Sequence, residues 1–281
     1  MVIIKCNNLR QSIDKISPSL LLKVNNEDYS LYYCSTIGIT MSLDRLLQHR
    51  AAWMRKAVLR HIYLDYFERI RAELEPGKTL ELGSGPGIFK EFLAATLSSD
   101  VIWSPWLDTV LDATAMPFKK ETFANLVLID VVHHLAQPGL FFQEAIRVLQ
   151  NRGKIVILDV QITPFSYPVY HFFHQEPVRM KINPLEPSLE QDPDDPFDSN
   201  QAITTLLFGS YWTEFQRSFP QLKLRQKKYF SFLNYPLSGG FEHRSFLTMK
   251  MYQRLLKVEK LLQPLARLLA FRNLIVLQKQ E

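Results

Sequence analysis

The sequence contains few cysteines and no long apolar segment. Cys6 and Cys34 are the only cysteines in 281 residues, which excludes a disulfide framework and a zinc site built from cysteines. No apolar run reaches the ~18 residues that a membrane-spanning helix needs. The N-terminal residues lack the basic and then apolar pattern of an export signal. We therefore expect a soluble, cytoplasmic protein.

The composition is that of an ordinary globular chain. Apolar residues make up 47% and charged residues 22%, which excludes a disordered or fibrous protein. The net charge is +5 and the calculated pI is 9.1. The basic excess is concentrated in residues 221–281, which contain 12 Lys and Arg but 3 Asp and Glu. The length fits one enlarged domain, or a core domain with an appended segment.

Residues 177–200 combine prolines with acidic residues. Five of the 16 prolines lie in this segment, and proline at that density excludes helix and interior strand. We expect a long irregular loop, which in a compact protein is often a lid or a binding loop, or else simply solvated. The acidic residues of this loop are Glu186, Glu190, Asp192, Asp194, Asp195 and Asp198.

The spacing of apolar residues predicts an α/β protein. One apolar residue in every three or four predicts a long helix over 43–74. Further along, short apolar segments alternate with helical patterns, which predicts a parallel sheet with right-handed crossovers. The expected strands are 78–83, 100–103, 108–112, 125–130, 154–160 and 274–277, with weaker candidates at 20–24 and 29–34. The expected helices are 88–97, 139–150 and 249–270, and 201–248 is a mixed region.

A glycine motif, Glu81-Leu-Gly83-Ser-Gly85-Pro-Gly87, stands between a predicted strand and a predicted helix. Glycines are needed where the chain turns sharply and its backbone approaches a ligand closely. The spacing differs from the dinucleotide motif G-x-G-x-x-G, whose third glycine would fall at Ile88, and the Gly-Lys-Ser/Thr of a phosphate loop is absent. The motif, with its acid before the first glycine, suits a ligand that has a cationic amino-acid part and an adenosine part.

Two more acids follow at spacings that fit the same ligand. Asp100 lies 17 residues after Gly83, where an acid can accept hydrogen bonds from both ribose hydroxyls. Asp112 opens the segment Asp-Ala-Thr-Ala-Met-Pro-Phe and can accept a hydrogen bond from an adenine amino group. Either acid alone could be a turn residue or a helix cap. Their order after the glycine motif favours a nucleoside site.

These segments together resemble the class I S-adenosylmethionine-dependent methyltransferases, in particular the small-molecule branch that includes ubiquinone and menaquinone biosynthesis enzymes. The resemblance rests on LELGSGPG, Asp100, DATAMPF, LVLIDVVHHL and FFQEAIRVLQNRGKIVILD. It covers residues 76–162 well and 249–281 loosely. Two positions depart from the family pattern: Asn151-Arg-Gly153 replaces the usual Pro-Gly-Gly, and Asn125 replaces an Asp that often opens the fourth strand.

The resemblance implies a Rossmann-like, seven-stranded sheet in three α/β/α layers. Residues 1–75 would form an N-terminal extension and helical cap. Residues 76–281 would form the methyltransferase domain, in which 163–248 is an insertion after the fifth strand that builds the acceptor pocket. The cofactor would be S-adenosylmethionine, with Asp130 near its sulfonium or the acceptor. The expected cofactor-binding residues are Glu81, Gly83, Ser84, Gly85, Gly87, Asp100, Asp112, Ala113 and Asp130.

Methyl transfer from a sulfonium mainly requires that the acceptor be positioned and water excluded. A phenol or enol acceptor also needs a base, most often histidine. The candidates are two pairs, His133 with His134 and His171 with His174; the second pair, spaced i, i+3, would share a helix face. Alternatively, the first pair starts a helix or lies at the surface, and the second packs against aromatic side chains. A metal site of His171, His174 and Glu176 is a further alternative, although we expect no metal.

Residues 163–241 are rich in aromatic side chains, which suggests an apolar pocket wall or a core. We expect Tyr170, Phe173 and Tyr235 to contact the acceptor. The Asn/Asp-Pro-Pro-Tyr/Phe motif of many base-amine and protein-amide methyltransferases is absent. The leading hypothesis is therefore methyl transfer to oxygen or carbon of a small, hydrophobic acceptor.

Three alternatives remain open. The basic C-terminal quarter could indicate a methyltransferase for RNA or another polyanion, although the modest net charge and the lack of an RNA-binding module disfavour nucleic acid. The chain could also bind the cofactor without catalysis and serve as an interaction subunit. Finally, the basic, amphipathic helix expected at 249–270 could contact a membrane surface or simply pack on the sheet. The sequence does not indicate an oligomeric state.

Overall fold

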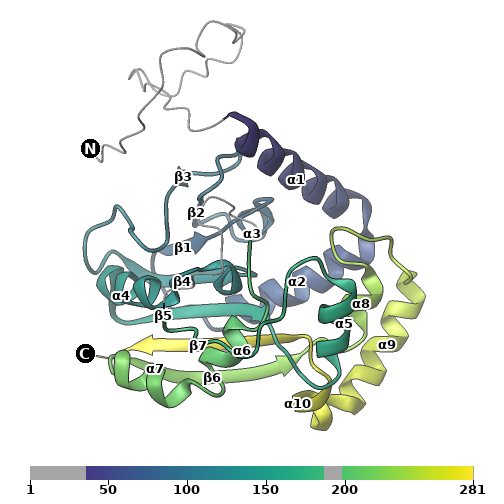
Figure 1. Ribbon diagram of the computed structural model, residues 1–281. Coiled ribbons are helices and arrows are strands. Elements are labelled where there is room, and N and C mark those ends of the chain that lie inside the picture. Colours follow the sequence, from purple (N-terminus) through teal and green to yellow (C-terminus); the bar gives the residue numbers. More distant parts are fainter. Residues whose placement is uncertain (1–35, 187–197, 281) are drawn as a thin grey trace, which may run out of the picture.

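The computed structural model describes residues 36–186 and 198–280. Its centre is a seven-stranded sheet with the order β3-β2-β1-β4-β5-β7-β6, shown in Figure 1. Strands β3, β2, β1, β4 and β5 run parallel to one another, whereas β7 runs antiparallel to both β5 and β6. The strands are β1 (Thr79–Leu82), β2 (Thr96–Asp100), β3 (Thr109–Val110), β4 (Phe123–Ile129), β5 (Leu149–Val160), β6 (Leu222–Phe230) and β7 (Arg272–Lys279).

Helices cover both faces of the sheet because the central strands are apolar on both sides. Leu126 and Leu128 of β4 pack in a cluster with α4 (Pro138–Val148), α6 (Ile203–Leu207) and α7 (Trp212–Ser218). Val127, between them, packs on the other face in a cluster with α2 (Ala57–Arg71), α3 (Ile88–Phe92) and α9 (Met249–Leu262). This arrangement confirms the predicted three-layer, seven-stranded fold.

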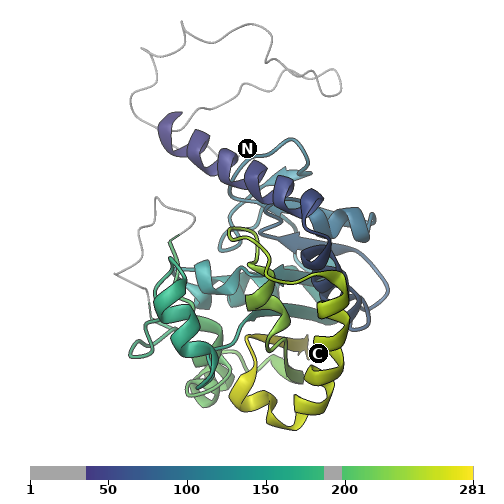
Figure 2. The same ribbon diagram turned by 90° about the vertical axis from the view of Figure 1, so that its right-hand side faces the viewer.

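The remaining helices lie around the carboxyl ends of the parallel strands. Figure 2 looks onto this side of the molecule, where α1, α5 and α8 surround the strand ends. These elements are α1 (Thr36–Arg55), α5 (Ser166–Phe173) and α8 (Asn234–Ser238), together with the short helices η3 (Val132–His134), η4 (Gln263–Leu265) and α10 (Ala266–Leu269).

The helix predicted over 43–74 is wrong in one respect, because the structure has two helices that meet at Lys56. The backbone of Lys56 is extended, with φ −96° and ψ 94°, which interrupts the helical pattern. Its ammonium donates a hydrogen bond to the carbonyl of Gly240 over 2.7 Å. The break therefore depends on a partner that lies far along the chain and that helical periodicity cannot reveal.

The boundary between the next helix and strand was also predicted wrongly. The helix expected over 88–97 ends at Phe92, and β2 occupies Thr96–Asp100 rather than 100–103. The strand was hidden because its buried centre is Ser98-Ser99 instead of an apolar pair. Ser99 donates a hydrogen bond to the carbonyl of Glu81 over 2.7 Å, so β2 is held against β1 partly by hydroxyl groups.

Part of the segment predicted as an insertion, 163–248, belongs to the sheet itself. β6 forms the edge strand beside β7, and the rest of the segment contributes α5 to α8. The described parts of the predicted loop, 177–186 and 198–200, contain neither helix nor strand. Its acids Glu190, Asp192, Asp194 and Asp195 lie outside the described residues, as do the strand candidates 20–24 and 29–34 and both cysteines.

The helix predicted over 249–270 consists of α9, η4 and α10. Among the residues of α9 only Tyr252 is buried, and Leu261 is 81% exposed. Leu255, Leu256 and Leu262 are partly buried against the core clusters, so the apolar stripe is only partly exposed, and membrane contact through it stays a prediction. Within the described ranges, no helix has the length and apolar character required to cross a membrane.

Candidate active site

A cavity of about 680 Å³ opens at the carboxyl ends of the parallel strands. This volume lies in the range of ~300–1,000 Å³ that is typical of small-molecule sites. The loops after β1, β2 and β4 line it on one side, and α1, α5 and the segment 235–243 line it on the other. All the predicted cofactor-binding residues except Gly87 line this one cavity: Glu81, Gly83, Ser84, Gly85, Asp100, Asp112, Ala113 and Asp130.

The glycine loop requires glycine for two different reasons. Gly83 has φ +68°, and a Cβ atom there would lie 2.4 Å from Cγ2 of Val131, in the loop after β4. Gly87 has φ +71°, and a Cβ atom there would lie 2.3 Å from Cδ1 of Trp106. Both positions combine a left-handed backbone with a close neighbour. The missing side chain at Gly87 therefore leaves room for the Trp106 ring, and Gly87 itself does not line the cavity.

Glu81 is buried at the end of β1 and faces the cavity. Burial raises the pKa of its carboxyl group to about 7, an effect that the hydrogen bond from Ser84 partly opposes. Ser84 Oγ donates to Glu81 Oε2 over 2.8 Å. Among the described residues Glu81 forms no ion pair, and a buried carboxylate of this kind gains from a ligand that brings a positive charge.

Asp100 and Asp112 are both held by hydrogen bonds within their loops. Asp100 accepts from the backbone N–H of Gly85 over 2.8 Å and from that of Ile102 over 3.0 Å, and burial raises its pKa. Asp112 is exposed and accepts from the backbone N–H and the hydroxyl of Thr114, both over 2.7 Å. Asp112 is thus a turn residue, which was one of the two alternatives to a ligand-binding role. It also lines the cavity.

Asp130 lies in an ion pair at the floor of the cavity. It follows β4 with φ +57°, forms an ion pair with Arg272, and accepts a hydrogen bond from the Tyr63 hydroxyl over 3.0 Å. Burial raises the pKa of Asp130, and the charge of Arg272 opposes this. The Arg272 guanidinium lies 4.2 Å from the centre of the Tyr235 ring. Sequence reasoning missed Tyr63 and Arg272; the one signal was an arginine next to the apolar run of the last strand.

His133 is buried in η3, directly after β4. Its Nδ1 lies 2.5 Å from Oδ1 of Asp159 in β5, and its Nε2 lies 3.6 Å from Oε2 of Glu176. Burial lowers the pKa of His133, but the Asp159 and Glu176 carboxylates outweigh burial and raise it to about 9. Asp159 therefore orients the His133 ring and, together with Glu176, favours its protonated form.

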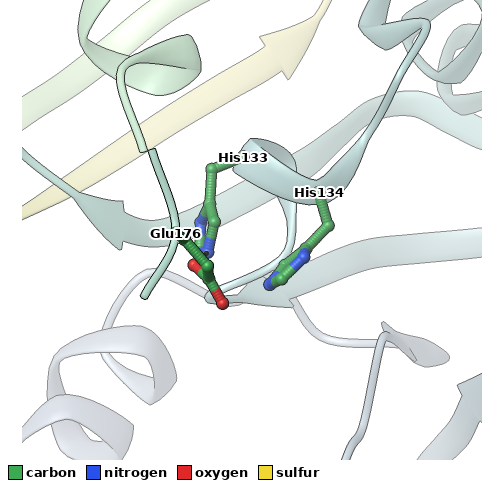
Figure 3. Close-up of side chains that lie close together, drawn as sticks. All are labelled: His133, His134 and Glu176. Carbon is green, nitrogen blue, oxygen red and sulfur yellow. Dashed lines mark ion pairs between the residues drawn. The ribbon is translucent and has the colours of Figure 1, made fainter. Parts of the chain in front are cut away.

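The other three predicted histidines separate into two groups. His134 and His174 line the cavity with His133; burial, followed by the charge of His133, lowers the pKa of His134 to about 4. His171 is exposed, stacks on Tyr167, and is not among the described residues that line the cavity. The predicted shared face does not form, since α5 ends at Phe173 and His174 follows it. Figure 3 shows that His133, His134 and Glu176 come together instead.

The three predicted acceptor contacts, Tyr170, Phe173 and Tyr235, also line the cavity. Tyr170 is held in place by a hydrogen bond from its hydroxyl to the carbonyl of Phe271 over 3.1 Å, whereas Phe173 is 75% exposed. Phe241, in the aromatic segment predicted as a pocket wall or core, also lines the cavity, and His49 of α1, which was missed in the sequence, stacks on it at 5.0 Å. Only tertiary folding brings α1 to the strand ends, so no local pattern could indicate His49.

Comparisons with known proteins agree with this geometry. A family model described as a methyltransferase domain matches residues 80–157. An S-adenosylmethionine-dependent methyltransferase from Thermotoga maritima, described as a possible histamine N-methyltransferase, is similar in fold with 15% identity and a TM-score of 0.52; the match covers 86% of this chain and 99% of that one. No curated protein sequence matches this chain.

The same fold also occurs in a protein of another reaction type. The [4+2]-cyclase SpnF matches with 12% identity and a TM-score of 0.52, covering 87% of this chain and 96% of that one. At these identities, the two structures establish the fold but not the reaction or the substrate. The family match includes β1, the glycine loop, Asp100, Asp112 and most of β5. Residues 80–157 thus match a methyltransferase domain, and the strand order is that of the class I S-adenosylmethionine-dependent methyltransferase fold.

Proposed function

We propose that this protein transfers the methyl group of S-adenosylmethionine to an oxygen or carbon atom of a small, partly apolar acceptor. The observation that carries the proposal is one continuous cavity. The predicted cofactor residues Glu81, Asp100 and Asp112 line one part of it, and a group of histidines and tyrosines lines the other. A cofactor and an acceptor bound there would be held side by side, and proximity supplies much of the catalysis in such a transfer.

The residues of the first part fit the cofactor's functional groups. Glu81, buried with its pKa raised, would hold the ammonium group of the methionine end. Asp100 would accept hydrogen bonds from the ribose, and Asp112 with Ala113 would meet the adenine. The bound cofactor supplies a methyl group already activated on a sulfonium. The chain's own task is to fix that end of the ligand and to keep water away from it.

The second part of the cavity fits an acceptor with an apolar body and an oxygen. Tyr170, Phe173, Tyr235 and Phe241 provide aromatic walls, which suit an apolar ring or chain. His133 is oriented by Asp159. Together with His134 and His174, His133 lines the wall where an acceptor hydroxyl would bind. His134 and His174 would accept a proton from that oxygen, and His133 in its protonated form would donate a hydrogen bond to it. His171, outside the cavity lining, has no such role in this proposal.

Isothermal titration with S-adenosylmethionine and S-adenosylhomocysteine tests the cofactor first. Transfer of a radioactive methyl group to a panel of small phenols and enols then tests the acceptor class, with bulk RNA as the contrasting acceptor. We expect binding of both cofactor forms, and label in an organic-soluble product. Binding without transfer to any acceptor would favour the non-catalytic alternative, and label in RNA would favour the polyanion alternative. A folded protein that binds neither cofactor form would overturn the proposal.

A further inference from the structure

Three side chains in the wall of the cavity place potential metal ligands close together. One ligand atom each from His133, His134 and Glu176 lies within 4.8 Å of the others, and Figure 3 shows the three side chains converging. The histidines come from η3, whereas Glu176 comes from the segment after α5. Two imidazoles and one carboxylate are a frequent ligand set for zinc and related divalent ions.

His133 has the orientation that a metal ligand needs. Its Nδ1 is occupied by Asp159, 2.5 Å away, so its Nε2 is directed toward Glu176 at 3.6 Å. A carboxylate on the far nitrogen of a histidine is the usual support of a metal-binding imidazole, because it fixes the ring and its tautomer. Glu176 is itself positioned by a hydrogen bond from the side-chain amide of Gln201. The 3.6 Å distance is long for a direct hydrogen bond.

The ring of His134 is held beside that of His133. The two ring centroids lie 4.3 Å apart, and Nδ1 of His134 is buried. His174 lies beside the group, with its Nδ1 3.9 Å from Oε2 of Glu176.

We propose that His133, His134 and Glu176 bind a divalent transition-metal ion of the zinc type in the acceptor part of the cavity. Two imidazole nitrogens favour such an ion over magnesium or calcium, which prefer oxygen ligands throughout. Three protein ligands leave at least one coordination position for a water molecule or an acceptor oxygen. The sequence analysis considered a different metal site, made of His171, His174 and Glu176. Only Glu176 belongs to both sets. The site stands on its own geometry and does not depend on methyl transfer.

Metal binding to the untagged, full-length protein tests the proposal directly. The protein is stripped with a chelator, dialysed against zinc, and analysed for bound metal; cobalt(II) then serves as a spectroscopic probe. We expect one zinc ion per chain and the visible absorption bands of cobalt bound in a low-coordinate site. Glu176→Gln and His134→Ala should each weaken zinc binding at least ~100-fold, more than the ~10–100-fold typical of losing a group that only supports a ligand.

His61→Ala is the matched control, since His61 is an exposed histidine on α2. It should bind zinc as the unchanged protein does. Glu176→Gln keeps the shape of the side chain, and its circular dichroism and melting temperature would confirm that it folds. A folded protein that binds no stoichiometric zinc would overturn the proposal, leaving His133 and Glu176 as an ion pair. Equal zinc binding by the unchanged protein, Glu176→Gln and His134→Ala would also overturn it.

Discussion

The carboxylate of Asp100 accepts a hydrogen bond from the backbone N–H of Gly85 over 2.8 Å. This contact joins the end of β2 to the glycine loop after β1, two segments that both line the cavity. The other carboxylate oxygen accepts from the N–H of Ile102 over 3.0 Å. Asp100 therefore shapes the loop from within while it presents its charge to the position expected for the ribose.

Asp100→Asn should weaken S-adenosylmethionine binding at least ~10-fold, because hydrogen bonds to a charged group contribute ~1.5–3 kcal/mol. One side-chain oxygen would also have to serve two backbone donors. Isothermal titration measures the affinity. Asp108→Asn is the control, since Asp108 also accepts from a backbone N–H, that of Ser98 over 2.7 Å, but is not among the described residues that line the cavity. Equal weakening by both variants would contradict a direct role of Asp100.

Gly83→Ala should destabilise the protein more than Gly85→Ala. Both glycines have a left-handed backbone, which costs a residue with a Cβ atom ~1–2 kcal/mol. At Gly83 the new Cβ atom would also lie 2.4 Å from Val131, whereas at Gly85 the nearest atom, in Leu46, is 3.9 Å away. Urea denaturation gives the two free energies of unfolding. Equal losses would show that Val131 moves aside without cost.

Glu81→Gln should stabilise the ligand-free protein at pH 8 and have little effect on stability at pH 5. Burial raises the pKa of Glu81 from an ordinary 4.5 to about 7. A carboxyl group with a raised pKa in the folded state costs stability as pH rises from the unfolded to the folded value, and the full cost applies above pH 7. The gain at pH 8 should be on the order of 2–3 kcal/mol, measured by urea denaturation at both pH values.

The same residue should give cofactor binding a pH dependence. The affinity of the unchanged protein for S-adenosylmethionine should rise between pH 6 and pH 8, because the ammonium group of the ligand prefers an ionised Glu81. In Glu81→Gln the affinity should be weaker and nearly independent of pH over this range. A profile that keeps its slope in the variant would assign the titration to another group.

Arg272→Met should cost on the order of 1–3 kcal/mol of stability, because it leaves the partly buried carboxylate of Asp130 without its ionic partner. The double variant Asp130→Asn with Arg272→Met removes both charges and should cost less than the two single changes added together. Urea denaturation of the four proteins gives this coupling energy. Additive losses would indicate that Asp130 and Arg272 contribute independently of each other.

The cofactor part of the site could be predicted from the sequence because each of its segments is local. Each parallel strand ends in a loop that emerges at the same edge of the sheet. Glu81 and Asp100 at the ends of β1 and β2, and Asp112 just after β3, therefore had to meet once the strands were recognised. The alternation of strands and helices also predicted the sheet, although Ser98 and Ser99 hid the true position of β2.

The acceptor part could not be predicted in this way. His171 and His174 have helical spacing, but the end of α5 at Phe173 separates them, and only His174 lines the cavity. Glu176 meets His133 across more than forty residues of chain, through a segment that has no helix or strand. Such contacts depend on where an irregular segment packs, and no periodicity in the sequence records that.

The sequence by itself determined most of the strands, their crossovers and the glycine loop, although not β6, because hydrophobic periodicity and backbone requirements act over short distances along the chain. Tertiary structure alone decided which charged groups became partners. Asp130 met Arg272 and Tyr63, and Asp159 met His133. Asp130 is partly buried and the other four are buried, and burying a charge is costly unless a partner compensates it. Which partner is available depends on the packed arrangement of the whole chain.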